Sequence, residues 1–111
     1  MRKLALAFLI VLTGFDGVNA EDLNSGNGVT PGCRAWIANT QTTFIQGFCT
    51  GRVIGVWEAA RIGGLVCSPE EVTNGQAIRV VVQYIDARPA RSHEQFAFLA
   101  LEAIQAAWPC K

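Results

Sequence analysis

The sequence is poor in the groups that metal and acid–base chemistry use, because its 111 residues contain a single histidine, His93. One imidazole excludes a histidine-rich metal site and any mechanism that needs two histidines. The sequence also lacks an excess of charge: nine basic residues balance nine acidic ones, so the formal net charge is zero. Binding to nucleic acid or to an anionic membrane surface depends on a basic excess, so the composition argues against both.

Charged residues make up only 16% of the chain and apolar residues 50%, which is the composition of one folded domain rather than a disordered tail. After the N-terminus, no segment is apolar for the roughly 20 residues that a bilayer span needs. The first twenty residues resemble a secretory signal peptide: Arg2 and Lys3 precede the apolar run Leu4 to Leu12, and Ala20 follows small and medium residues. We expect cleavage after Ala20, leaving residues 21–111 as an exported domain without membrane contact; an uncleaved anchor is the alternative.

The chain contains four cysteines, all after residue 20: Cys33, Cys49, Cys67 and Cys110. An even number in a small exported domain predicts two disulfides, with three pairings open. A zinc site is the alternative, but no CxxC pair is present and zinc ligands usually come in close pairs. Folding the chain at 40–42 places the first two cysteines opposite each other, because each lies eight residues from Gln41. The last two are equidistant from the Arg88–Pro89 junction, so we predict the pairs Cys33–Cys49 and Cys67–Cys110.

Apolar residues recur at helical spacing in four segments, so the sequence predicts an all-α fold: a small four-helix bundle of two antiparallel hairpins linked by two disulfides. Residues 21–30 are polar and are expected to form a loose leader. We expect the first helix to begin near Pro31, which suits a first helical turn, and to end near Ala38. The other helices should span about 43–62, 74–86 and 92–107, with capping boxes at Thr73 and Ser92.

Small residues recur every fourth position along the second expected helix: Gly47, Gly51, Gly55, Ala59 and Gly63. Each interior glycine costs a helix about 1 kcal/mol relative to alanine. Such a row is favoured where another helix must approach closely, so we expect a helix of the same chain to pack against it. A contact between two copies of the chain is the alternative.

No pairing of a nucleophile with a base stands out in the sequence. Ser92 and His93 lie near Asp86, but Ser92 is better explained as a helix cap. The adjacent Glu70 and Glu71 suit the positive end of a helix dipole. We therefore expect no catalytic residue, no metal and no cofactor, and we predict that the chain is not an enzyme.

Two aromatic residues are expected to project from polar helix faces, namely Phe98 and Trp57, whereas Trp36 and Trp108 are expected in the core. Exposed aromatic residues favour an interface, although neighbouring elements could instead cover them. Charged residues cluster in the turn before the last helix, where they could steer a partner toward Phe98, or could simply be solvated. The predicted partner-binding residues are Asp86, Arg88, Arg91, His93, Phe98 and Trp57.

Taken together, residues 25–111 resemble the Rap/Tai family of immunity proteins from type VI secretion systems. The segments that carry the resemblance are Cys49-Thr50-Gly51 with Gly55, Cys67-Ser68-Pro69, Thr73-Asn74-Gly75-Gln76, Val80-Val81 to Tyr84-Ile85, Arg88-Pro89, and Trp108-Pro109-Cys110-Lys111. The chain departs from the family pattern at Arg88, where a histidine is usual, and at Arg52, where an aromatic residue is usual.

The resemblance implies a periplasmic, disulfide-bonded helical protein, often a homodimer. It implies that the protein binds a peptidoglycan amidase effector and occludes its active-site groove without chemistry of its own. A small periplasmic acid-stress chaperone is the alternative function, but few acidic residues and one histidine are available for a switch at low pH. A small hydrolase is disfavoured by the lack of a nucleophile–base pair.

Overall fold

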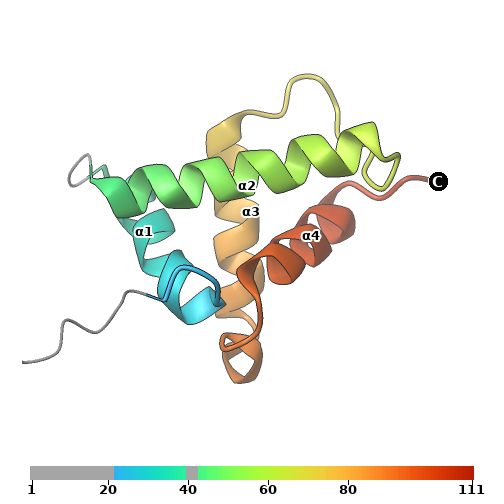
Figure 1. Cartoon of the computed structure of the whole chain (residues 1–111). Coiled ribbons are helices and arrows are strands. Elements are labelled where there is room, and N and C mark those ends of the chain that lie inside the picture. Colours follow the sequence, from blue (N-terminus) through green and yellow to red (C-terminus); the bar gives the residue numbers. More distant parts are fainter. Residues whose placement is uncertain (1–21, 40–42) are drawn as a thin grey trace, which may run out of the picture.

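The computed structural model describes residues 22–39 and 43–111, where the chain forms four α-helices. These are α1 (Gly26–Ala38), α2 (Phe44–Ile62), α3 (Asn74–Asp86) and α4 (Phe96–Ala107), with a short 3-10 helix, η1 (Pro89–Arg91), before α4 (Figure 1). No strand occurs within the described ranges, and the all-α prediction is confirmed. The expected signal peptide at 1–20, its cleavage site and the turn at 40–42 lie outside the described residues.

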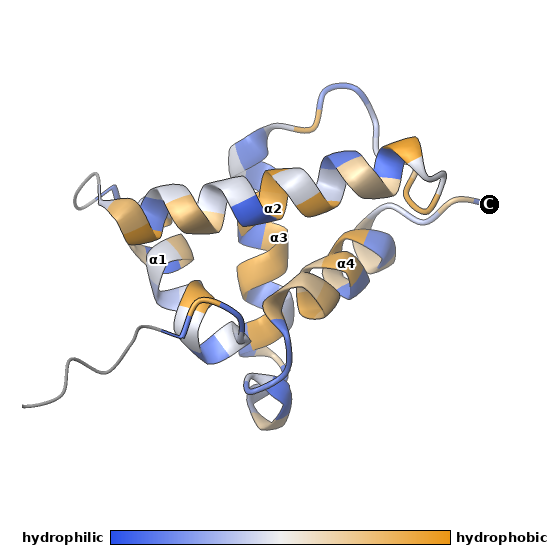
Figure 2. Cartoon of the chain, in the orientation of Figure 1, coloured by the Kyte–Doolittle hydropathy of each residue, from blue (hydrophilic) through white to orange (hydrophobic). Residues whose placement is uncertain are grey.

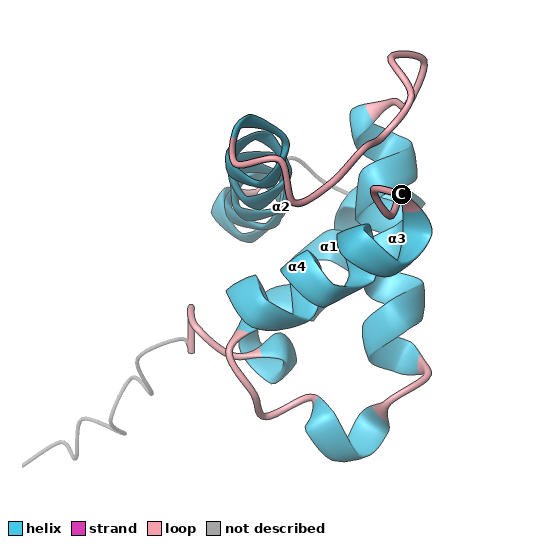
Figure 3. Ribbon diagram, turned by 90° about the vertical axis from the view of Figure 1, so that its right-hand side faces the viewer, coloured by secondary structure: helices cyan, strands magenta, loops and turns pink. Residues whose placement is uncertain are grey.

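The helices form two pairs, α1 with α2 and α3 with α4, and α2 also packs against α3 and α4. In Figure 1, α2 crosses α3, and in Figure 3, where α2 is seen nearly end on, α4 lies below it. The core lies where the four helices meet, and α4 is predominantly hydrophobic (Figure 2). The largest fully buried side chains of the core include Phe96, Ile78, Leu99 and Ile104. On α3, Ile78, Val81, Val82 and Ile85 are buried, as the helical spacing predicts.

Both predicted disulfides are present, which confirms the pairing. Cys33–Cys49 joins α1 to α2, and both of its residues are fully buried. Cys67–Cys110 joins the segment after α2 to the C-terminal tail, and both of its residues are exposed. This second bond explains why the C-terminus lies beside the end of α2 in Figure 1.

The start of α1 differs from the prediction, because the helix begins at Gly26 and Pro31 lies inside it. The Ser25 hydroxyl caps the helix by accepting a hydrogen bond from the Gly28 N–H. Residues 24–26 are also fixed to the start of α4: the Phe96 N–H donates to the Asn24 carbonyl at 2.7 Å, and the Gly26 N–H donates to the Glu94 carbonyl at 3.0 Å. A serine cap and contacts across the chain therefore give a longer helix where a loose leader was expected.

The start of α4 also differs, since the helix begins at Phe96 rather than at Ser92. The Ser92 hydroxyl donates to the Pro89 carbonyl at 2.9 Å, so it closes η1 and does not cap α4. At Thr73 the hydroxyl half of the predicted capping box is present, because the hydroxyl accepts from the Gln76 N–H at 3.1 Å; among the described helices, the two-way capping box is found at Thr43.

The glycine row on α2 does not receive a second helix of the chain, and that expectation is wrong. Apart from the backbone of α2 itself and the neighbouring residues in the chain, no atom of the described structure would lie within 4 Å of a Cβ added at Gly47, Gly51 or Gly55. The close helix approach is instead at Gly32 of α1, where a Cβ would come closer than 3.0 Å to the backbone carbonyl of Ile45. Gly32 precedes the buried Cys33–Cys49 bond, so the disulfide and the missing side chain together bring α1 against α2.

Candidate partner-binding surface

Phe98 projects from the outer side of α4 with 60% of its surface exposed, as predicted. Beside it, a groove of about 250 Å³ lies between α4 and the C-terminal part of α2. Alkyl and aromatic side chains form this groove: Val56, Ala59, Ala60, Leu65, Ala97, Phe98 and Leu101. Leu65 is itself half exposed, at 51%. The groove can therefore accept an apolar side chain of a partner.

Arg91 organises a cluster of charged residues next to this groove. Its Nε donates to the Glu94 carboxylate at 2.6 Å, and its Nη2 donates to the carboxylates of Glu94 and Glu102, each at 3.0 Å. The Tyr84 hydroxyl donates to Glu102 at 2.8 Å. Because Arg91 donates to both charged carboxylates, it lowers the pKa of Glu94 and of Glu102. The cluster fixes the turn between α3 and α4.

Arg88 is held over the ring of Tyr84, with its guanidinium carbon 3.6 Å from the ring centroid. Its Nη1 also donates to the Tyr84 carbonyl at 3.1 Å. Within the described residues, no carboxylate lies within ion-pair distance of Arg88. The structure therefore presents an exposed, oriented cation that remains available to an acidic group of a partner.

The groove and the charged cluster lie on one surface, because Glu102 follows Phe98 by one turn of α4. We call this surface the α4 face and define it by Leu65, Tyr84, Arg88, Arg91, Phe98, Leu101 and Glu102. It unites three of the predicted partner-binding residues, namely Arg88, Arg91 and Phe98. His93 is exposed on the segment that joins η1 to α4.

Two predicted residues lie elsewhere. Asp86 forms an ion pair with Arg34 of α1, and both residues line a separate hollow of about 320 Å³ between α1 and η1. Trp57 is buried, with 6% exposed, so the expectation that it projects from the surface is wrong. Its ring stacks on Trp108 with centroids 6.1 Å apart, and its Nε1 donates to the Ser68 hydroxyl at 2.9 Å. The Cys67–Cys110 bond holds the segments that cover it.

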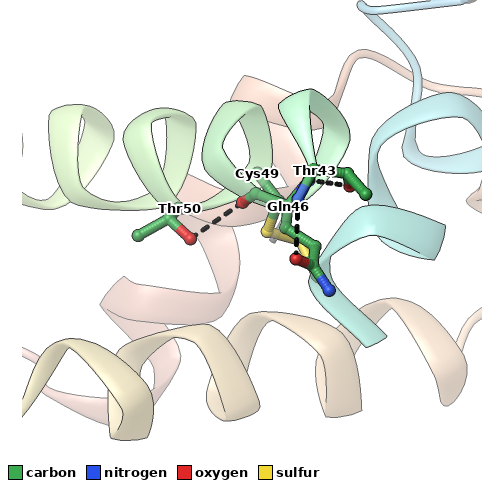
Figure 4. Close-up of a disulfide and its surroundings, with 5 residues drawn as sticks. Thr43, Gln46, Cys49 and Thr50 are labelled. Atoms are coloured by element: carbon green, nitrogen blue, oxygen red, sulfur yellow. Dashed lines mark hydrogen bonds between the residues drawn. A yellow bond between two sulfur atoms is a disulfide. The ribbon is translucent and has the colours of Figure 1, made fainter. Parts of the chain in front are cut away.

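Trp57 was predicted to be exposed because it shares a face of α2 with polar residues. That face is not fully exposed, since Gln46 on the same face is also buried. Its amide oxygen accepts from the Thr43 N–H at 3.0 Å, and its backbone carbonyl accepts from the Thr50 hydroxyl at 2.9 Å (Figure 4). These local hydrogen bonds satisfy polar groups inside the fold. The residues of the α4 face that sequence reasoning missed are Leu65, Tyr84, Leu101 and Glu102. The position of Glu102 one turn after Phe98 was the available signal; nothing in the sequence marks Leu65.

A larger hollow of about 530 Å³ follows the glycine row of α2, between Trp36 and Glu58. It has a mixed polar and apolar lining and lacks an exposed aromatic side chain comparable to Phe98, so the α4 face is the better candidate.

No helix within the described ranges is long and apolar enough to cross a bilayer. The described part of the chain also holds no cluster of three residues able to bind a metal.

The Arg91 cluster predicts how the stability of the fold depends on pH. The folded-state pKa values of Glu94 and Glu102 are lowered, so their stabilising effect is complete above about pH 5 and is lost as pH falls through the folded pKa values. We expect the urea midpoint to fall more between pH 6 and pH 3 in the wild type than in Arg91→Gln. Urea titrations at low ionic strength, followed by circular dichroism, would measure this, because salt screens exposed charges. Parallel profiles for the two proteins would contradict it.

Comparison of the sequence with known proteins identifies a family. A family model described as Rap1a immunity proteins matches residues 25–110, a range that contains all four helices and both disulfides. Neither the curated proteins nor the solved structures gave a match to the chain. The match covers most of the chain and agrees with the resemblance carried by its cysteine motifs. The chain therefore belongs to the Rap1a immunity protein family.

Proposed function

We propose that this chain is a periplasmic immunity protein that binds a peptidoglycan amidase effector of a type VI secretion system and blocks its active-site groove. Family membership supports an immunity role. The signal-peptide pattern at 1–20 and the two disulfides support an oxidising, exported compartment.

The α4 face is the observation that carries the proposal. Protein interfaces combine a central apolar contact with a polar rim, and aromatic and arginine residues contribute most of their binding energy. Phe98 and its groove supply the apolar contact, whereas Arg88 and His93 supply the rim. Because Arg88 is already oriented by Tyr84, less side-chain entropy is lost when it meets a partner.

The proposed blocking of the effector, without catalysis by this chain, agrees with the contacts that the polar side chains of this surface make. Arg91, Glu94 and Glu102 bind one another, and the Ser92 hydroxyl is bound to the Pro89 carbonyl. None of these groups is left as an activated nucleophile beside a base. In this proposal the surface therefore blocks the effector by covering its active-site groove. The homodimer implied by the resemblance also belongs to this proposal.

Protection of cells tests the proposed function. Cells that direct a type VI peptidoglycan amidase to their own periplasm should lyse, and the full chain should prevent lysis. A variant lacking residues 2–20 should accumulate in the cytoplasm and fail to protect, which is the matched control. The protective protein should have the mass of a chain that begins at Glu21. Lysis despite an equal amount of the exported chain would contradict the proposal.

A further inference from the structure

The two disulfides differ in their access to solvent. Cys33 and Cys49 are both 0% exposed within the core, whereas Cys67 and Cys110 are both exposed. Thiol–disulfide exchange requires a thiolate to reach one of the two sulfur atoms, so access governs its rate. An external dithiol can therefore approach one bond of the folded chain and not the other.

The exposed bond holds a set of contacts over Trp57. The Cys67 N–H donates to the Trp108 carbonyl at 3.0 Å, and the Trp108 ring stacks on Trp57. On the other side, Trp57 donates to Ser68, the residue after Cys67. The bond thus connects the tail and the loop that together cover this indole.

The same bond lies beside the groove of the α4 face. Leu65, which lines the groove, precedes Cys67 by two residues, and its N–H donates to the Ala60 carbonyl at 2.8 Å. The Cys110 sulfur lies 3.6 Å from the Gly64 carbonyl oxygen. The segment that supplies one wall of the groove is therefore tied to the C-terminal tail through Cys67–Cys110.

We propose that Cys67–Cys110 is a thiol–disulfide exchange site for an external dithiol, and that opening it releases the loop that carries Leu65 while Cys33–Cys49 stays oxidised. A thiolate of the dithiol attacks one of the two sulfurs, the S–S bond breaks, and the other cysteine leaves as a thiolate and takes a proton. The second thiol of the dithiol then attacks its own sulfur in the mixed disulfide and frees the remaining cysteine. Two electrons pass to the chain, and the dithiol becomes a disulfide.

The partner fits the chemistry of a dithiol–disulfide oxidoreductase with an exposed active-site thiol. The consequence for the groove rests on the proposed function, because the α4 face has its partner-binding role only there. The exchange itself does not depend on that role and can be measured on the free protein.

The test uses the folded, oxidised chain without denaturant. Samples treated with limiting dithiothreitol are quenched by alkylation, and the labelled cysteines are identified by peptide mapping. We expect Cys67 and Cys110 to react at least about tenfold faster than Cys33 and Cys49. We also expect tryptophan emission to shift to longer wavelength as Trp57 becomes hydrated, while the helical signal in circular dichroism persists.

Two variants act as controls. The double variant Cys67→Ser/Cys110→Ser should already show the shifted emission and should not change further with dithiothreitol. In Trp57→Phe, reduction should produce a smaller shift. Equal labelling rates for both disulfides, or full labelling of Cys67 and Cys110 with unchanged emission, would overturn the proposal. If the oxidised chain fails to bind an amidase, the proposed function fails and the exchange result is unaffected.

Discussion

Gly32→Ala should lower the free energy of unfolding by about 2–3 kcal/mol, because overpacking of a well-packed contact has costs of this size. The added Cβ would meet the backbone carbonyl of Ile45, which cannot rotate away as a side chain could. The buried Cys33–Cys49 bond limits how far α1 and α2 can separate to accommodate it. Urea unfolding of the oxidised protein, followed by circular dichroism, would measure the loss.

Gly51→Ala is the matched control, since it adds the same methyl group at a helical glycine where the new Cβ would meet no described atom outside its own helix within 4 Å. We expect this variant to raise the free energy of unfolding by about 1 kcal/mol, the difference in helix propensity between the two residues. The two substitutions should thus act with opposite signs. Equal losses of unfolding free energy in both variants, or no loss in either, would contradict the assignment of the close helix contact to Gly32.

Phe98→Ala should weaken binding to the amidase effector by about 2 kcal/mol, which is roughly a 30-fold increase in Kd. Phe98 is the exposed aromatic residue beside the apolar groove, so truncation removes the contact expected at the centre of the interface. Its outward position means that the free energy of unfolding should change by less than about 0.5 kcal/mol. Isothermal titration calorimetry with the purified effector would give the Kd.

Phe44→Ala provides the control for that measurement. Phe44 is exposed to a similar degree, at 68%, but lies at the opposite end of α2 and contacts Phe48. Its truncation should change the Kd by less than about twofold, since single exposed apolar residues are common and usually carry little energy. Equal losses for Phe44→Ala and Phe98→Ala would contradict the assignment of the α4 face.

Much of the fold could be predicted from the sequence because its determinants are local. The spacing of Ile78, Val81, Val82 and Ile85 identifies α3, and the symmetry of the cysteines about two turns gives both disulfides. The errors arose where contacts between distant segments decide. Residues 24–26 form hydrogen bonds with the start of α4, which no local pattern reveals. Likewise, the C-terminal tail, which Cys110 bonds to Cys67, covers Trp57 with the ring of Trp108.

The candidate site was predictable to a similar extent. An aromatic residue on a polar helix face identified Phe98, and a charged turn identified Arg88 and Arg91. The sequence did not show that Arg91 is engaged with Glu94 and Glu102, or that Leu65 completes a groove, because both depend on how α4 packs against its neighbours. The glycines on α2 had the spacing of a helix contact, yet the fold satisfies that contact with Gly32 instead.

Inhibition measured in a purified system tests the central claim most directly. A type VI peptidoglycan amidase, assayed on peptidoglycan fragments, would be titrated with oxidised chain comprising residues 21–111. Occlusion by a surface predicts that hydrolysis falls to zero at stoichiometric amounts of the chain, with no product formed by the chain alone. Undiminished hydrolysis in the presence of excess chain, or turnover of the fragments by the chain itself, would contradict the account.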